Sequence, residues 1–205
     1  MKIAIDGPAA AGKTTLARRL AQALGFLFVP TGAMYRAAAL AHQRGLPLEE
    51  TEITVGENGR VFLNGEDVTD LLSNPALDEL SSRLAAEPRV RARLVELQRR
   101  IAEGRNVVME GRDIGTVVLP DAELKIFLWA TLEERARRRQ REQGGSFAEV
   151  LEAIRRRDER DSTRSCSPLR PAPDAVVLDT TDKTPDEVLK MALKLVEERR
   201  ARLAS

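Results

Sequence analysis

The stretch that decides the fold is Gly7-Pro8-Ala9-Ala10-Ala11-Gly12-Lys13-Thr14. It matches G-x-x-x-x-G-K-[ST], the loop whose backbone N–H groups surround nucleotide phosphates. Lys2–Asp6 comes directly before it and is apolar enough to predict a buried strand. Thr15–Leu24 follows, with leucine and alanine at helical spacing, and Gly25 is the expected end of this helix. A strand, a phosphate loop and a helix in this order favour a nucleotide-binding α/β domain over a chance match in an ordinary turn.

The loop brings several attractive groups to one anion. Its glycines let the chain turn tightly and approach a ligand without a Cβ in the way. The helix N-terminus adds a partial positive charge. In loops of this kind the lysine reaches the β- and γ-phosphates, and the hydroxyl of the last residue binds Mg²⁺. The expected nucleotide site consists of Gly7, Pro8, Ala9, Ala10, Ala11, Gly12, Lys13, Thr14 and Thr15, with Mg²⁺ held by Thr14, the phosphates and water.

Composition restricts the functional classes. The 205 residues suit one α/β domain with a small insert, and the formal net charge of +1 gives no overall attraction to nucleic acid or to an acidic membrane. Most of the 33 basic residues are arginines, and we assign the surplus ones to the charge-rich surface of a heat-stable protein. Cys166 is the only cysteine, which favours a reduced, cytoplasmic setting without disulfides. The only histidine, His42, is expected at the surface of a helix.

The chain alternates strands and helices in the order typical of a parallel sheet. The expected central strands are residues 2–6, 26–29, 106–110, 124–129 and 175–179. The expected helices are residues 15–24, 33–44 (after a break at Pro30–Gly32), 76–86, 90–103, 131–143, 146–161 and 184 onward. Thr131, Ser146 and Thr184 each precede a glutamate by three residues, which is capping-box spacing. Trp129, at the end of a strand, is expected to pack rather than to stack on adenine.

Residues 49–88 interrupt this pattern with short strands. Strands are expected at residues 51–55, 60–63 and 66–68. Asn58-Gly59 predicts a two-residue hairpin turn, and Asn64-Gly65 predicts another turn. Because the segment is too short to bury a large core of its own, we interpret it as an insert.

Three polar clusters stand out, and two of them lie near the carboxyl ends of strands, where ligands bind to open α/β sheets. Thr31–Arg36 begins a helix after the second strand, and Glu110–Asp113 ends the third central strand. Arg157, Asp161 and Arg164 share one face of a helix, between a Gly-Gly pair and a proline-rich loop. Each cluster also has an ordinary interpretation: a helix start with a surface arginine, a charged turn, or an exposed ladder of ion pairs.

At these residues the chain resembles the bacterial cytidylate kinases, a family of nucleoside-monophosphate kinases. The resemblance covers nearly the whole chain. Its specific parts are Glu110–Val118 and the arginine and aspartate pattern of residues 157–161, whereas the phosphate loop is shared by many families. Ala9–Ala11 departs from the pattern, since relatives often have serine or glycine there.

The resemblance implies an α/β fold of the P-loop kinase type. Its sheet would have five parallel strands in the order 2-3-1-4-5, with helices on both faces. The single domain would comprise a core (residues 1–48, 89–141 and 171–205), a small α+β insert that binds the nucleoside monophosphate (49–88) and a short lid (142–170).

The resemblance also implies roles for single residues. The phosphate of CMP would be held by Arg36, Arg112, Arg157 and Arg164. Cytosine would be read by Ser82, Arg91 and Asp113, and the ribose would be held by Asp161. The implied CMP site is completed by Thr31, Tyr35 and Gly111. The implied catalytic residues are Lys13, Arg112, Arg157 and Arg160, of which Arg160 would face the transferring phosphoryl group.

The implied reaction transfers the γ-phosphoryl group of ATP to CMP or dCMP, giving ADP and CDP or dCDP, with Mg²⁺ as cofactor. The attacking phosphate oxygen is ionised near neutral pH, so we expect positioning and charge stabilisation without a general base. We expect a cytoplasmic monomer with small-molecule substrates. Only 3% of residues are aromatic, which disfavours nucleic acid as a partner. No apolar run reaches transmembrane length, and we expect no signal peptide.

Two other functions stay open at this point. A kinase for another small acceptor, such as shikimate or dephospho-coenzyme A, would share the phosphate loop, but a phosphate-free acceptor needs fewer converging arginines. A nucleotide-dependent switch would hydrolyse ATP or GTP slowly whatever acceptor was added.

The role implied for Arg160 gives the first prediction. We expect Arg160→Ala to lower kcat by on the order of 10²-fold or more, as for other arginines that clamp a transferring phosphoryl group. Steady-state turnover at saturating ATP and CMP measures the effect. Near-normal turnover would remove Arg160 from this role.

Overall fold

The computed structural model describes all of residues 1–205. Its strands are β1 (Lys2–Asp6), β2 (Leu27–Pro30), β3 (Ile53–Val55), β4 (Val61–Leu63), β5 (Glu66–Asp67), β6 (Val107–Gly111), β7 (Leu124–Trp129) and β8 (Val176–Asp179). Its α-helices are α1 (Lys13–Leu24), α2 (Thr31–Gln43), α3 (Pro75–Leu84), α4 (Pro88–Ala102), α5 (Leu132–Gln143), α6 (Phe147–Thr163) and α7 (Pro185–Ala204). Short helical turns are η1 (Leu48–Glu50), η2 (Glu57–Gly59), η3 (Thr69–Leu71) and η4 (Ile114–Val118), of which η4 is π-helical.

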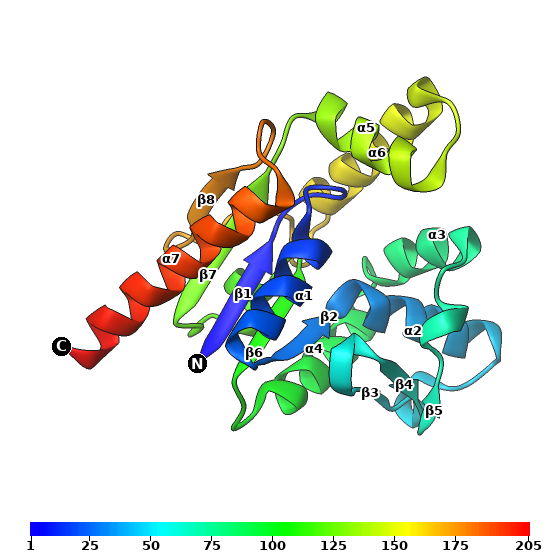
Figure 1. Ribbon diagram of the computed structural model, residues 1–205. Helices are drawn as coiled ribbons and strands as arrows, with labels where there is room; N and C mark the ends of the chain where they lie inside the picture. Colours follow the sequence, from blue (N-terminus) through cyan, green and yellow to red (C-terminus); the bar gives the residue numbers. More distant parts are fainter.

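Five parallel strands form the central sheet in the order β2-β6-β1-β7-β8. Counted among these five strands, the order is 2-3-1-4-5, so the predicted order is confirmed. β1 lies in the middle of the sheet and carries the phosphate loop at its carboxyl end (Figure 1).

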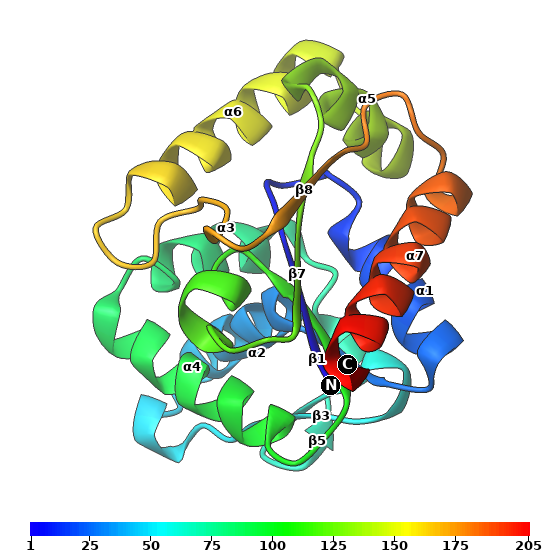
Figure 2. The same ribbon diagram turned by 90° about the vertical axis from the view of Figure 1, so that its left-hand side faces the viewer.

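Each face of the sheet has its own apolar core, because side chains alternate along a strand. Ile3 and Ile5 of β1 belong to a core shared with α1 and α7. Ala4, between them, belongs to the opposite core, which α2, α4 and the strands of residues 49–88 complete. Figure 2 shows α1 and α7 on one side of the sheet and α2 and α4 on the other. These two cores hold the carboxyl edge of the sheet in a fixed shape.

Strands β3, β4 and β5 form a separate antiparallel sheet. The Asn64-Gly65 turn joins β4 directly to β5, with the positive φ angles that a type I′ turn requires. The prediction of a two-residue hairpin turn at Asn58-Gly59 is wrong. Val55 pairs with Val61, so residues 56–60 make the connection, and a backbone hydrogen bond from Gly56 to Arg60 closes this wider loop.

The two helices that face the carboxyl edge begin earlier than predicted. α1 begins at Lys13, inside the phosphate loop. α2 begins at Thr31, so the predicted break at Gly32 is wrong; Gly32 lies in the first turn, where backbone N–H groups lack helical partners. The side chains of Thr131 and Thr184 cap α5 and α7 as predicted, but Ser146 makes no such hydrogen bond at α6.

Burial differs from expectation at Trp129 and is unusual for an arginine at Arg135. Trp129, the last residue of β7, is 42% exposed, and β8, which pairs with β7, is an edge strand of the sheet. Arg135, in the arginine-rich helix α5, is only 6% exposed. Its guanidinium donates to the carbonyl oxygens of Ala130 and Ala9 and pairs with Asp158 of α6 at 2.6 Å. His42 is exposed, as predicted.

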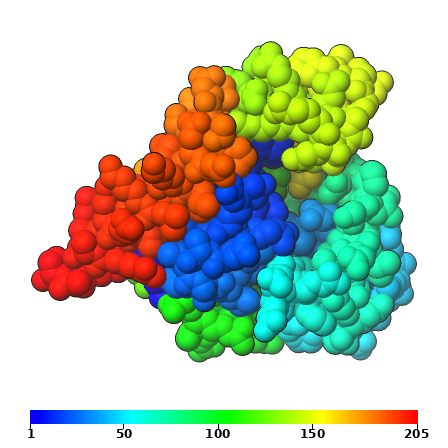
Figure 3. Space-filling view, in the orientation of Figure 1, coloured from blue at the N-terminus to red at the C-terminus, as the bar shows by residue number.

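A wide cleft opens at the carboxyl edge of the central sheet. The space-filling view shows it between α5 and α6 on one side and α3 on the other, with the blue N-terminal segment at its base (Figure 3). Its cavity of about 1170 Å³ is lined by residues of α3 and α6 and by Ala9 and Thr14 of the phosphate loop. The fold therefore places the loop at the bottom of an open cleft.

None of the helices combines the length and the apolar surface that crossing a membrane needs.

The backbone at Gly7 gives a stability prediction. Its φ is +152°, and a Cβ there would overlap the main-chain oxygen of Leu128 in β7. Since neither backbone can move aside cheaply, we expect Gly7→Ala to lower the free energy of unfolding by about 3 kcal/mol or more. Urea unfolding measures the loss.

Gly65→Ala is the matched control for this variant. Gly65 also has positive φ, +84°, but nothing lies near its missing Cβ. The expected loss is about 1 kcal/mol from backbone strain alone. Equal losses in the two variants would contradict the overlap at Gly7.

Candidate active site

The phosphate loop holds its own lysine in place. The Lys13 ammonium donates to the carbonyl oxygen of Pro8 at 2.8 Å, which folds the side chain back over the loop. The backbone is left-handed at Ala10 (φ +60°) and Gly12 (φ +96°). At Ala10 this conformation is strained, as it would not be for glycine. The loop adopts this shape although Ala9–Ala11 stand where relatives often have serine or glycine.

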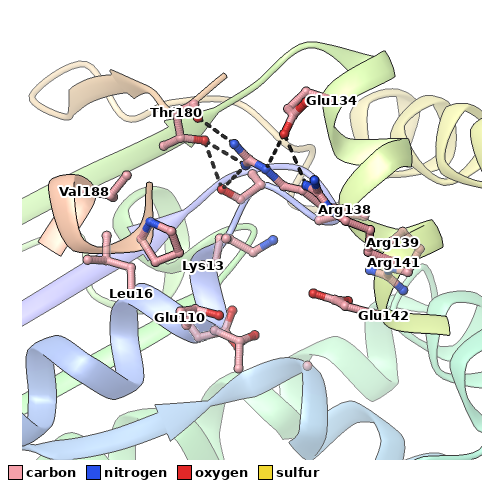
Figure 4. Close-up of a pocket in the computed structure, with 18 of the residues that line it drawn as sticks. Lys13, Leu16, Glu110, Glu134, Arg138, Arg139, Arg141, Glu142, Thr180 and Val188 are labelled. Atoms are coloured by element: carbon pink, nitrogen blue, oxygen red, sulfur yellow. Dashed lines mark hydrogen bonds and ion pairs between the residues drawn. The ribbon is translucent and has the colours of Figure 1, made fainter. Parts of the chain in front are cut away.

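A cavity of about 560 Å³ opens over the loop, a size that suits a nucleotide. Residues 9–15 line it, whereas Gly7 and Pro8 do not; α5 and the start of α7 supply other walls. In Figure 4, Arg138 of α5 lies between Thr180 and Glu134. It donates to the Thr180 carbonyl at 2.5 Å and the Thr180 hydroxyl at 3.0 Å, and more weakly to the Ala11 carbonyl at 3.4 Å. These bonds connect the loop to the turn before α7.

Three cations converge where this cavity meets β6. Burial lowers the pKa of Lys13 to about 7, and the charge of Arg112 adds to the effect. The charge of Arg112 also lowers the pKa of Arg157 to about 10, with burial as the second cause. The Arg157 Nε atom is buried without a hydrogen-bond partner. Such a cluster favours a bound anion, because negative charge relieves the repulsion among the cations.

Thr14 and Glu110 place oxygen atoms at the edge of the same cavity. The Thr14 hydroxyl donates to Glu110 Oε1 at 3.0 Å, and both residues line the cavity. A hydroxyl and a carboxylate, completed by phosphate oxygens and water, form a ligand set that Mg²⁺ prefers. The residues present therefore fit Mg²⁺.

A second, smaller cavity lies beside the first. It contains every residue of the predicted CMP site except Arg36: Thr31, Tyr35, Ser82, Arg91, Gly111, Arg112, Asp113, Arg157, Asp161 and Arg164. Arg112 and Arg157 line both cavities. The second cavity has a volume of only about 30 Å³, which is too small for a nucleoside monophosphate.

Internal ion pairs occupy this second cavity. Arg91 Nη1 lies 2.6 Å from Asp113 Oδ2, and both side chains are only 4% exposed. Asp161 lies between two arginines: its Oδ2 is 2.5 Å from Arg112 Nε, and its Oδ1 is 3.5 Å from Arg164 Nη1. A ligand could enter this cavity only if its charged and polar groups replaced one partner in these ion pairs.

Tyr35 adds an unpartnered polar atom to the second cavity. Its hydroxyl is buried without a hydrogen-bond partner, and the Arg91 guanidinium lies 5.3 Å from the ring centroid. Burial raises the pKa of Tyr35, so the hydroxyl stays protonated and can donate.

Two predicted site residues lie toward the cleft instead of the second cavity. Arg36 lines the larger cavity, with Nη1 3.6 Å from Asp78 Oδ1. Arg160 lines neither of the two cavities; it donates to the Ser82 hydroxyl at 2.7 Å across the cleft, and lies 3.4 Å from Glu79. In this arrangement Ser82, expected to read cytosine, is paired with Arg160.

Some residues of the site were absent from the predicted set. Glu110 had a signal, since it belongs to the polar cluster at the end of β6. Arg138 had none, because α5 carries several arginines that look equivalent in the sequence. Asp6 was predicted only as the end of a strand. Its buried carboxylate accepts hydrogen bonds from the backbone of η4, and burial raises its pKa to about 7 against the opposing effect of those bonds.

Gly111 lies where the chain leaves no room for a Cβ atom. A Cβ at this position would overlap the Thr31 hydroxyl, which donates to the Glu110 carbonyl at 2.7 Å. The close neighbour that requires glycine is therefore another part of the chain, at the point where β6 meets α2.

The lowered pKa of Lys13 gives a prediction for nucleotide binding. At about pH 8 the free chain holds Lys13 mostly neutral, and bound phosphates favour its charged form, so binding should take up a proton. Affinity for Mg·ADP should fall by up to about tenfold per pH unit above pH 7.

Titration calorimetry in buffers with different ionisation enthalpies measures this uptake. The uptake should be much smaller near pH 6, where Lys13 is already an ammonium. Binding at pH 8 without proton uptake would contradict the assignment of a neutral, buried Lys13.

Comparison with known proteins identifies the family. Residues 3–198 match the family model described as cytidylate kinase. The cytidylate kinase of Caldanaerobacter subterraneus subsp. tengcongensis is 48% identical over 211 residues, which cover 96% of this chain and 94% of that protein. The cytidylate kinase of Thermotoga neapolitana is 49% identical over 214 residues, which cover 97% of both.

Solved structures agree on the fold. A Thermus thermophilus protein is 25% identical with a TM-score of 0.51, and the match covers 97% of this chain and 96% of that one. Shikimate kinase from Acinetobacter baumannii, at 15% identity and a TM-score of 0.53 over 96% of this chain and 93% of that one, shares the fold alone. Because the family match spans the phosphate loop and both cavities, the chain belongs to the cytidylate kinase family and has a P-loop kinase fold.

Proposed function

We propose that this chain transfers the γ-phosphoryl group of ATP to CMP or dCMP and releases ADP and CDP or dCDP. The observation that carries the proposal is that Arg112 and Arg157 line both cavities. ATP on the phosphate loop and CMP in the second cavity would direct their reacting phosphates at the same two guanidinium groups. Positive charge at that point offsets the repulsion between two anions, which otherwise keeps them apart.

Catalysis would rest on positioning and charge. An ionised oxygen of the CMP phosphate would attack the γ-phosphorus, and the bond from that phosphorus to the bridging oxygen would break, so no base is needed. Lys13 would stabilise charge on the β- and γ-oxygens, and Arg112 and Arg157 would stabilise the transferring group. Thr14, with Glu110 beside it, would hold Mg²⁺, which neutralises phosphate charge when bound.

Recognition of cytosine would depend on Asp113. A carboxylate accepts a hydrogen bond from the N4 amino group of cytosine, whereas uracil presents only a carbonyl oxygen at that position. Asp113 already accepts a hydrogen bond from Arg91 Nη1 at 2.6 Å through its Oδ2 atom. UMP would leave the carboxylate facing an acceptor, which is the larger part of the discrimination.

Binding of CMP would also require movement. The second cavity is too small as it stands, and its walls come from the end of β6 and from α2, α3, α4 and α6. We propose that residues 49–88 and 142–170 move as the insert and the lid. The bonds of Arg160 to Ser82 and Glu79 would break in this step; part-exposed contacts of this kind exchange at little cost. Closure would then exclude water from the reacting phosphates.

An assay of ADP release with several acceptors tests the function. The panel is CMP, dCMP, UMP, AMP, GMP, shikimate and buffer alone, with ATP and Mg²⁺ throughout. We expect fast release with CMP and dCMP only. Similar release in every tube would indicate a switch, and release with shikimate another kinase. We also propose that the protein is a monomer in the cytoplasm. Light scattering of the same preparation tests the monomeric state.

The role of Asp113 gives a selectivity prediction. We expect Asp113→Asn to lower the CMP-to-UMP ratio of kcat/KM by about tenfold or more, because the amide no longer discriminates donor from acceptor. The KM for ATP should stay within about twofold, since Asp113 does not line the larger cavity.

A ratio measured in one preparation is the right readout here. Loss of the Asp113 charge leaves Arg91 buried and unpaired, which costs about 3 kcal/mol or more of stability. The ratio of two substrates is independent of the folded fraction. Asp121→Asn, at an exposed aspartate, is the control. An unchanged ratio in Asp113→Asn would remove this residue from base recognition.

A further inference from the structure

The turn that carries Arg112 and Asp113 into the site is held at both ends by side chains from other elements. It leaves β6 at Gly111 and continues as η4, a π-helical turn. Short helical turns leave several N–H groups at the start and C=O groups at the end without partners inside the turn. In η4 an aspartate accepts from the N–H groups at the start, and an arginine donates to the carbonyl groups at the end.

Asp6 binds the start of the turn. Its Oδ1 accepts from the Ile114 N–H and its Oδ2 from the Gly115 N–H, each at 2.8 Å. The side chain is 6% exposed, so water cannot easily replace these bonds. Asp6 is the last residue of β1 and directly precedes Gly7. One carboxylate thus links the root of the phosphate loop to the turn of the second cavity.

Arg99 binds the end of the turn. From α4, its Nη2 donates to the Val117 carbonyl at 2.7 Å and its Nε to the Val118 carbonyl at 3.0 Å. The neighbouring Arg100 points elsewhere and pairs with Glu96 and Glu52. The two adjacent arginines therefore form a natural pair of variant and control.

We infer that Asp6 and Arg99 are positioning residues that hold η4, and through it Arg112 and Asp113, at a fixed distance from the phosphate loop. The inference rests on the proposed function for the identity of the acceptor. Neither residue lines the two cavities, so each acts through the turn. The effect should fall mainly on the acceptor, because Asp113 lines only the second cavity and the Asp6 carboxylate accepts from N–H groups of η4 and from none of the phosphate loop.

The test compares Asp6→Asn, Arg99→Ala and Arg100→Ala in the full chain. An asparagine at position 6 accepts from one N–H group and turns its own amide hydrogens toward the other. We expect Asp6→Asn to raise the KM for CMP by about tenfold while the Kd of Mg·ADP stays within about twofold. Arg99→Ala should raise the KM for CMP by about threefold, because water can reach the freed carbonyls, and Arg100→Ala should leave it unchanged.

Amide hydrogen exchange adds a readout that needs no substrate. The amides of residues 114–118 should exchange faster in Asp6→Asn and Arg99→Ala than in Arg100→Ala. If Asp6 and Arg99 had only a folding role, their substitution would lower the melting temperature. The KM for CMP, and the ratio of the affinities for CMP and Mg·ADP, would stay unchanged.

Several results would overturn the inference. One is an equal KM for CMP in Arg99→Ala and Arg100→Ala, whether or not Asp6→Asn folds. Another is an equal loss of affinity for CMP and Mg·ADP in Asp6→Asn. If the unaltered chain phosphorylated no monophosphate, the proposed function would fail instead, and the exchange rates would still decide whether Asp6 and Arg99 hold the turn.

Discussion

Repulsion among Lys13, Arg112 and Arg157 is the constraint that the rest of the structure serves. The three cations come from α1, from the end of β6 and from α6, and they meet in a largely buried site. Burial, and then the charge of Arg112, lowers the pKa of Lys13, and the charge of Arg112, and then burial, lowers the pKa of Arg157. Elements that carry them stay together because two apolar cores fix the sheet and the helices on its faces. A bound polyphosphate would turn this unfavourable arrangement into an attractive one.

Acidic residues neutralise only part of the positive charge of this cluster and of the neighbouring arginines. Asp161 is shared by Arg112 and Arg164, while Asp113 pairs with Arg91. Buried pairs of this kind add little net stability, because burial costs about as much as the attraction returns, but they define geometry. The small volume of the second cavity is a consequence of this pairing. Acceptor binding is therefore best understood as an exchange of partners, in which a phosphate replaces a carboxylate at an arginine.

The sequence located the polar clusters where the chemistry is local or lies at strand ends. Glu110–Asp113 and Thr31–Arg36 reach the site because the carboxyl ends of parallel strands meet at one edge of a sheet. Contacts between distant segments had no signal in the sequence. The bond from Arg160 to Ser82 joins α6 to α3, and the burial of Arg135 depends on Asp158 and on the phosphate loop. Nothing in an arginine-rich helix marks which of its members will meet such a partner.

Residues 2–24 determined by themselves that the chain would form a strand, a phosphate loop and a helix, because glycine spacing, backbone conformation and apolar periodicity are properties of neighbouring residues. The position of the polar clusters at strand ends was likewise contained in the sequence. Only the tertiary structure decided which carboxylate meets which guanidinium and that Asp6 binds the turn after Arg112. The physical reason is that these interactions depend on distances of a few ångströms between residues far apart in the chain, and those distances are set by the packing of the two cores.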